Sequence, residues 1–205
     1  MTEAEWLTCT DTVTMLGFLR GRGSRRKRRL FACACCRLIW HRIPDGPCRE
    51  LVRTAERLAD GLATHADRQD DVRAAALWVG AHAAPVRAVG AVTYASYRDT
   101  SHANCVGAAE NAAGADPTTR PVQAVVLRCI FHPFHAVAAD PGWLTSTVLC
   151  LARTIYEDRA YDRLPILADA LEDAACDEPA LLEHCRSDGP HVRGCWAVDL
   201  VLGRE

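Results

Sequence analysis

The chain has 205 residues, which suits one domain or two closely packed halves. Its 49% hydrophobic content is too high for a disordered chain, and its formal net charge of −2 excludes a global positive field that would attract nucleic acid or an anionic membrane. No apolar run approaches the ~20 residues of a membrane span. The start Met1–Trp6 is acidic and lacks the features of a secretory signal, so we expect a cytoplasmic protein with no membrane partner.

Helical periodicity dominates the N-terminal half. Apolar residues recur at spacings of three and four over Arg49–Ala63 and again over Asp70–Ala83. Residues 86–113 are rich in Ala and Val, which predicts a helix lying close against its neighbours. Gly90 and Gly107 argue against a continuous helix there.

The loop Gly114–Thr119 is the clearest break in the chain. It predicts a single helical domain over residues 1–205, with sub-halves 1–114 and 119–205 joined by this loop.

The C-terminal half contains consecutive helix starts and stops. The pattern predicts helices beginning near Pro121, Thr145, Leu164 and Pro179, and a last, mostly apolar helix over His191–Leu202. Short consecutive helices favour antiparallel helical hairpins, and no strand alternation of more than a few residues is present. The sequence therefore predicts an all-α fold, a compact multi-helix bundle.

Two blocks carry a resemblance to a known family. The first is Met1–Trp40, with Glu3-Ala-Glu-Trp-Leu and Leu30-Phe-Ala-Cys-Ala-Cys-Cys-Arg; the second runs from Trp143-Leu-Thr through Leu164-Pro-Ile-Leu-Ala-Asp-Ala-Leu-Glu-Asp to His191-Val-Arg-Gly-Cys-Trp. Together they resemble a family of uncharacterised, cysteine-containing helical proteins common in planctomycete genomes. The resemblance covers both ends of the chain. It implies a bacterial cytoplasmic protein and supplies no catalytic residues.

The chain contains eleven cysteines, an odd number that cannot all pair within one chain. With no export signal we expect them to be reduced, and most of them to be small core residues.

A zinc site is the sharper interpretation of some of these thiols. Cys33 and Cys36 are three residues apart on a predicted helix, Leu30–His41, and His191 and Cys195 are one helical turn apart near the C-terminus. These four residues would form a Cys₃His site linking the N- and C-terminal helices. The alternative is that they are small residues where helices approach closely. No cofactor is required by the sequence, and zinc is the one that it allows.

His132 and His135 also suggest a metal pair. Pro133 disturbs the helix that would align them, so surface or loop histidines are the favoured interpretation.

A basic run is the most biased segment of the chain. Seven positive charges fall within ten residues: Arg20, Arg22, Arg25, Arg26, Lys27, Arg28 and Arg29. The run could follow a phosphate backbone or bind an acidic protein partner. No interleaved aromatic residues support base stacking. The favoured alternative is a solvated loop and first helical turn, balanced by acidic surfaces such as Glu172, Asp173, Asp177 and Glu178.

Catalytic motifs are missing from the sequence. It has no Gly-rich phosphate loop, nucleophile elbow or zinc-protease motif. The absence of these motifs favours a protein that is not an enzyme but does not decide the question. The leading hypothesis is a non-enzymatic, cytoplasmic helical module for protein interaction or regulation, with an unknown protein partner. The alternatives are a zinc-binding protein and a nucleic-acid binder acting through the basic run.

Overall fold

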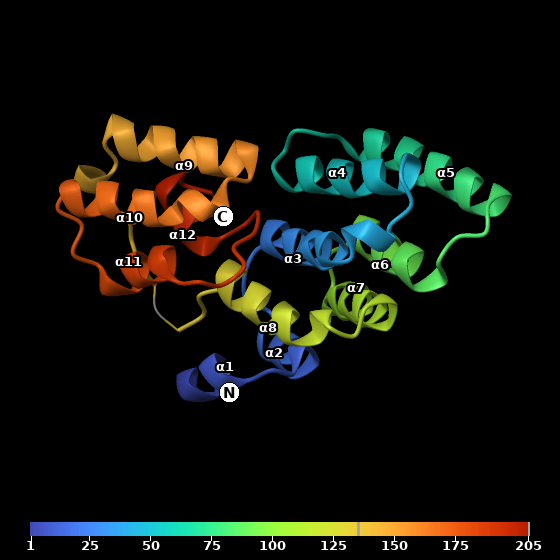
Figure 1. Cartoon of the computed structure of the whole chain (residues 1–205), viewed down its shortest axis with the longest axis horizontal. Helices are drawn as coiled ribbons and strands as arrows, with labels where there is room; N and C mark the ends of the chain where they lie inside the picture. Colours follow the sequence, from blue (N-terminus) through green and yellow to red (C-terminus); the bar gives the residue numbers. More distant parts are fainter. Residues whose placement is uncertain (135, 205) are drawn as a thin grey trace. The chain divides into compact units, whose positions relative to one another are not determined.

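The computed structural model describes residues 1–134 and 136–204, and these residues form α-helices and three short 3-10 helices, with no strand among them (Figure 1). The prediction of an all-α fold is confirmed. None of the described helices has both the length and the apolar character needed to cross a membrane. The chain divides into two compact units, one from Met1 to Leu127 and one from Arg128 to the C-terminus.

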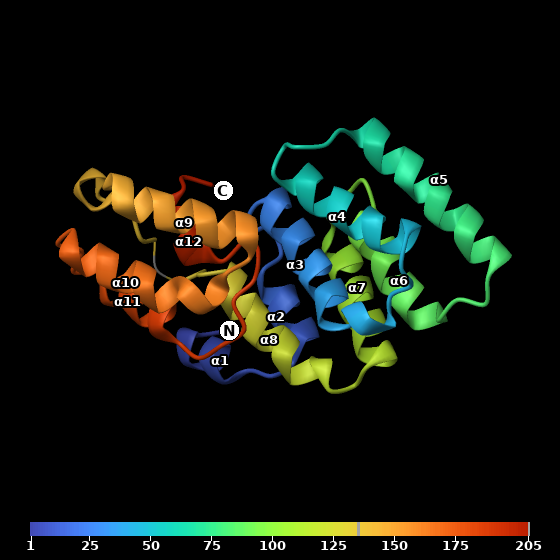
Figure 2. The ribbon, with the colours of Figure 1, turned by 45° about the horizontal axis from the view of Figure 1, so that its top comes forward.

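The first unit is built around one central helix. Its elements are α1 (Glu3–Thr8), α2 (Thr12–Phe18), α3 (Arg25–Leu38), η1 (Trp40–Arg42), α4 (Pro47–Ala59), α5 (His65–Ala81), α6 (Val86–Ser96), α7 (His102–Ala115) and most of α8 (Thr119–Ile130). Helix α3 contacts α4, α6 and α7 (Figure 2). Every residue from Arg29 to Cys36 is buried, so the small Ala and Cys side chains of α3 allow neighbours on all sides.

Two helices of this unit begin and end earlier than the periodicity predicts. Helix α4 ends at Ala59 because Gly61 adopts a φ of 73°, and Leu62, counted in the predicted apolar stripe, is 67% exposed. Helix α5 begins at His65, where Thr64 and Asp67 form a reciprocal capping box that the sequence analysis missed.

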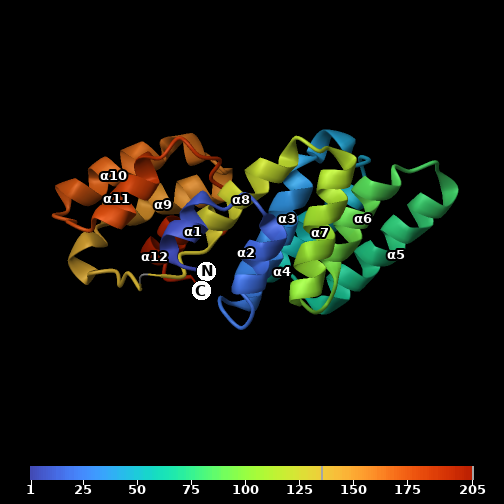
Figure 3. The same ribbon diagram turned by 90° about the horizontal axis from the view of Figure 1, so that it is seen from below.

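Residues 86–113, predicted as one stretch, form two helices that lie side by side (Figure 3). The two glycines lie inside these helices and serve close packing. A Cβ on Gly107 of α7 would meet the Tyr94 ring of α6 at 2.5 Å, and a Cβ on Gly90 of α6 would collide with Asn111 of α7. The helical stretch is interrupted between Tyr97 and Ser101, and neither glycine lies in that interruption.

The second unit is a set of short consecutive helices. Its elements are the end of α8, η2 (Pro141–Trp143), α9 (Ser146–Asp158), η3 (Tyr161–Arg163), α10 (Leu164–Asp173), α11 (Pro179–Arg186) and α12 (Trp196–Val201). Helix α10 packs against both α9 and α11, and α12 packs against α9. The turn η3 reverses the chain between α9 and α10, as the predicted antiparallel hairpins require (Figure 1).

One core holds this unit together. It contains Val148, Ala152 and Ile155 of α9 and Leu164, Leu167 and Leu171 of α10, which recur at spacings of three and four along each helix. Cysteines 129, 176, 185 and 195 belong to the same core. Thiols therefore gather where the helices of this unit meet.

Two predictions about the chain's organisation have different outcomes. The last helix begins at Trp196, so the predicted helix over His191–Leu202 is wrong in its first five residues, which form an extended segment and a turn. The division between the units falls within α8, whereas the loop between α7 and α8 spans residues 116–118. The prediction of one domain with sub-halves 1–114 and 119–205 stays a prediction.

The substitution Gly107→Ala tests the close approach of α6 and α7. We expect it to lower the free energy of unfolding by about 1–2 kcal/mol, because crowding the Tyr94 ring costs more than the helix propensity gained. Gly80→Ala is the matched control, since a Cβ there meets nothing within 4 Å. It should raise stability by up to ~1 kcal/mol. Urea unfolding followed by circular dichroism measures both, and equal effects would contradict the packing argument.

Candidate metal centre

Four metal-ligating side chains of the second unit converge. They are Cys129, His184, His191 and Cys195, and one ligand atom from each lies within 4.8 Å of those of the others. Both cysteines are buried and both histidines are half-buried. The four residues come from the last turn of α8, from α11, from the segment after α11 and from the N-cap of α12.

The contacts run crosswise between these segments. Nδ1 of His191 lies 3.7 Å from Sγ of Cys129, and Nε2 of His184 lies 3.2 Å from Sγ of Cys195. The two imidazole rings meet edge to face, with centroids 4.8 Å apart. A tetrahedral zinc ion with ordinary Zn–S and Zn–N bonds would hold its sulfur and nitrogen ligands about 3.6 Å apart. The separation between His191 and Cys129 matches that spacing, and the one between His184 and Cys195 is about 0.4 Å shorter.

Packing and capping place the first two ligands. Cys129 is buried in the last turn of α8, and His184 precedes the fully buried Cys185 on α11. Pro179 opens α11, and Leu181 anchors it in the core of the unit. His184 therefore lies at the edge of a packed helix, with its ring 5.0 Å from that of Trp196.

A tight turn places the other two ligands. The backbone N–H of Cys195 donates to the carbonyl of Val192 at 2.9 Å, and Gly194 adopts a φ of 91° at the third position of the turn. That position of a type II turn requires positive φ, which favours glycine. Cys195 then caps α12, whose first helical hydrogen bond runs from the N–H of Asp199 to the carbonyl of Cys195.

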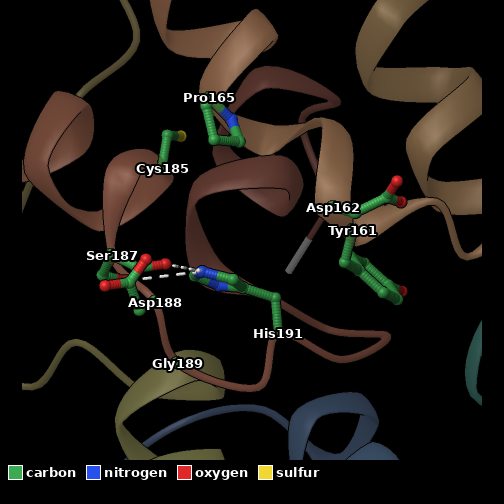
Figure 4. Close-up of a pocket in the computed structure, with 8 residues that line it drawn as sticks. All are labelled: Tyr161, Asp162, Pro165, Cys185, Ser187, Asp188, Gly189 and His191. Atoms are coloured by element: carbon green, nitrogen blue, oxygen red, sulfur yellow. Dashed lines mark hydrogen bonds between the residues drawn. The ribbon is translucent and has the colours of Figure 1, made fainter.

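A hydrogen bond orients the ring of His191. Its Nε2–H donates to the carbonyl of Ser187 at 3.1 Å, and the Ser187 hydroxyl lies 3.4 Å from the same nitrogen (Figure 4). This hydrogen bond turns the other ring nitrogen, Nδ1, toward Cys129. Metal-binding histidines commonly use a backbone carbonyl in this way to fix their tautomer.

The electrostatics of the cluster favour one thiolate. Burial alone would raise the pKa of Cys195, but hydrogen bonds from Cys129, His184 and His191 outweigh it and hold that pKa well below its usual value. Burial, together with the hydrogen bond to Cys195, raises the pKa of Cys129. For His191, burial lowers the pKa, but the hydrogen bond to Cys195 and the charge of Cys195 raise it by more. The net shift of the His191 pKa is therefore upward. The hydrogen bonds of the cluster therefore favour the charged form of Cys195 over that of Cys129.

The predicted ligand set is only partly brought together. His191 and Cys195 belong to the cluster. Cys33 and Cys36 lie in α3 of the other unit and are not members, and burial raises the pKa of both thiols, as expected of core residues. Cys129 and His184 complete the cluster, and the sequence analysis did not select them.

The pair His132 and His135 has a separate outcome. The ring of His132 stacks on Trp196, with centroids 4.3 Å apart, and His132 is not in the cluster of ligands. His135 lies outside the described residues.

A cavity adjoins the cluster within the second unit. Its volume is about 310 Å³, and its lining consists of Tyr161, Asp162, Pro165, Cys185, Ser187, Asp188, Gly189 and His191 (Figure 4). His191 belongs to both features, so one face of the cluster borders this cavity.

The basic run is used inside the first unit. Arg29 is 6% exposed and donates to the carbonyls of Tyr97 and Arg98 at 2.9 and 3.0 Å, and Arg28 donates to that of Thr100 at 2.9 Å. These carbonyls follow the end of α6, where helical partners run out. Arg26 pairs with the buried Asp60 at 3.0 Å.

The interpretation of the basic run as a solvated loop and first helical turn is therefore correct only in part. The predicted first helical turn is confirmed, because Ser24 caps α3 at Arg25. Five arginines of the run nevertheless contact partners within the first unit: Arg20, Arg22, Arg26, Arg28 and Arg29. Glu172, predicted to balance the run, pairs with Arg186 of its own unit at 2.6 Å. Binding of nucleic acid or an acidic partner through this run stays a prediction.

The chain matches none of the protein-family models, curated proteins or solved structures with which it was compared. The donor set and the geometry of the cluster therefore carry the functional argument.

Replacing Arg29 tests its structural role. Arg29→Met should lower the free energy of unfolding by about 2–3 kcal/mol, because two carbonyls lose a charged donor. The exposed Arg25 is the matched control, and Arg25→Met should stay within about 0.5 kcal/mol of the parent. Urea unfolding compares the two. A neutral Arg29→Met would show that the guanidinium does not hold the segment after α6.

Proposed function

We propose that the second unit is a zinc-binding helical domain whose closed Cys₂His₂ centre is structural. The observation that carries the proposal is the convergence of one ligand atom each from Cys129, His184, His191 and Cys195 within 4.8 Å. Zinc would tie the end of α8 to α11 and to the start of α12.

The donor set selects the metal. Two sulfurs and two imidazole nitrogens suit zinc, whereas Mg²⁺ and Ca²⁺ prefer oxygen ligands. Zinc brings two positive charges to a buried thiolate and removes the proton of the second thiol. The hydrogen bond from His191 to the Ser187 carbonyl supplies the outer support that such ligands use.

Four protein ligands support a structural role over a catalytic one. A catalytic zinc site keeps a coordination position for water or substrate, and a four-ligand site does not. Cys129 and His191 are 62 residues apart in the chain, so a metal between them closes nearly the whole second unit. Such a link adds stability to a small core made of short helices, because it lowers the conformational entropy of the unfolded chain.

This centre fits the wider hypothesis of a non-enzymatic module. We infer a cytoplasmic interaction or regulatory role with a protein partner, in which zinc fixes the helices that present the binding surface. The resemblance to planctomycete proteins implies a bacterial cytoplasmic protein and supplies no activity.

Metal analysis of the purified chain tests the centre. We expect about one zinc per chain, measured by elemental analysis, and a loss of that zinc in Cys195→Ser and in His184→Ala, because each removes one of four ligands. Zinc at 100 times its dissociation constant should add about 2.7 kcal/mol to the stability of the folded chain, and a chelator should remove it.

Matched thiols outside the cluster serve as controls. Cys185→Ser changes a buried thiol one residue from a ligand, and Cys33→Ser changes a buried thiol of the first unit. Both variants should keep their zinc. Zinc retained by Cys195→Ser, or lost with Cys33→Ser, would contradict the proposed ligand set.

The turn before α12 offers a second test. Gly194→Ala should weaken zinc binding by about 10–100-fold, as loss of outer support does, because strain at a φ of 91° displaces Cys195 from His191. Gly203→Ala is the control: its φ is 62° and a Cβ there meets nothing within 4 Å. Competition with a chromogenic chelator measures both affinities. Equal affinities would show that the turn does not position the ligands.

A further inference from the structure

The two sulfur ligands lie beside each other on separate segments. Cys129 ends α8 and Cys195 precedes α12, and their Sγ atoms lie within 4.8 Å. The thiol of Cys129 also hydrogen bonds to the sulfur of Cys195. On a tetrahedral zinc ion the two sulfurs would be about 3.8 Å apart, and a disulfide needs about 2.05 Å. From the zinc-bound arrangement the two sulfurs would have to approach by about 1.7 Å to form a disulfide.

We propose that the zinc centre is a redox switch: hydrogen peroxide joins Cys129 to Cys195 in a disulfide and thereby releases the metal. This inference concerns the regulation of the proposed zinc site and rests on that proposed function.

The reaction balances in two steps. The Cys195 thiolate attacks one peroxide oxygen, which gives a sulfenic acid and, after protonation of the leaving hydroxide, one water. The Cys129 thiolate then attacks the Cys195 sulfur and forms the S–S bond, and the S–O bond breaks to release hydroxide, which takes one proton from solvent and becomes the second water. Two thiolates lose two electrons in total, peroxide gains them, and zinc leaves unreduced as Zn²⁺. Two imidazoles alone are a poor site for zinc.

The cavity gives a route for a small oxidant. It borders the cluster at His191, its volume of about 310 Å³ exceeds that of one peroxide molecule, and its other walls include the polar Ser187 and Asp188. Cys185 lines the same cavity but is not a member of the ligand cluster. Zinc would hold Cys129 and Cys195 as thiolates and would leave Cys185 as a thiol, so the ligand pair is the expected product.

The test uses the full, zinc-loaded chain carrying Cys150→Ser, which removes the exposed thiol of α9. Hydrogen peroxide is added in steps while 4-(2-pyridylazo)resorcinol reports free zinc. We expect release approaching one zinc per chain, a Cys129–Cys195 crosslink in peptide mapping, and recovery of zinc binding after dithiothreitol. Cys185→Ser in the same background should release its zinc equally.

Other outcomes overturn the inference. Zinc retained under excess peroxide, zinc released with a Cys185–Cys195 crosslink, or release abolished by Cys185→Ser would each do so. A chain that takes up no zinc at all would defeat the proposed function by itself. The zinc-free chain is then oxidised in the same way, and the absence of the Cys129–Cys195 crosslink there would overturn the pairing as well.

Discussion

The reversal of the chain between His191 and Cys195 is the constraint on which the candidate centre depends. In a continuous helix these side chains would lie one above the other on one face. The turn at Gly194 instead lets His191 reach Cys129 while Cys195 reaches His184. The turn that orients His191 and Cys195 depends on a backbone conformation that side chains disfavour, and Gly194 adopts it at a φ of 91°. The backbone conformation at Gly194 therefore sets the directions in which His191 and Cys195 point.

The burial of Cys195 connects the charge of the cluster to the stability of the unit. Cys195 is fully buried, and removing an anion from water is costly unless charge or hydrogen bonds compensate. Cys129 and the two histidines supply hydrogen bonds, and a divalent cation would supply the charge. Chelation should therefore affect folding and metal content together. Oxidation would remove the anion itself by turning both sulfurs into a neutral disulfide.

Sequence reasoning reached the helices more easily than the ligands. Apolar residues such as Val148, Ala152 and Ile155 recur about once per helical turn, so periodicity alone predicts which side of the helix is buried. His191 and Cys195 were found because they are close in sequence. Cys129 and His184 carry no such pattern: each is a single residue on a helix, and only the folding of distant segments unites them. Cys33 and Cys36 have a convincing spacing but lie among the packed helices of the first unit.

The two units satisfy their buried polar groups in different ways. In the first, Arg29 is almost fully buried and donates to carbonyls that α6 leaves without helical partners, so protein atoms complete the arrangement. In the second, imidazole nitrogens contact both sulfurs, and a metal would take the place of these contacts by binding both sulfurs as thiolates and each imidazole through a nitrogen lone pair. A chelator should for this reason destabilise the second unit and leave the first unit's arginine contacts unaffected. The positive charge that the sequence concentrates at the start of α3 acts within the fold of the first unit, and the proposed metal site uses the sulfurs of Cys129 and Cys195 in the second.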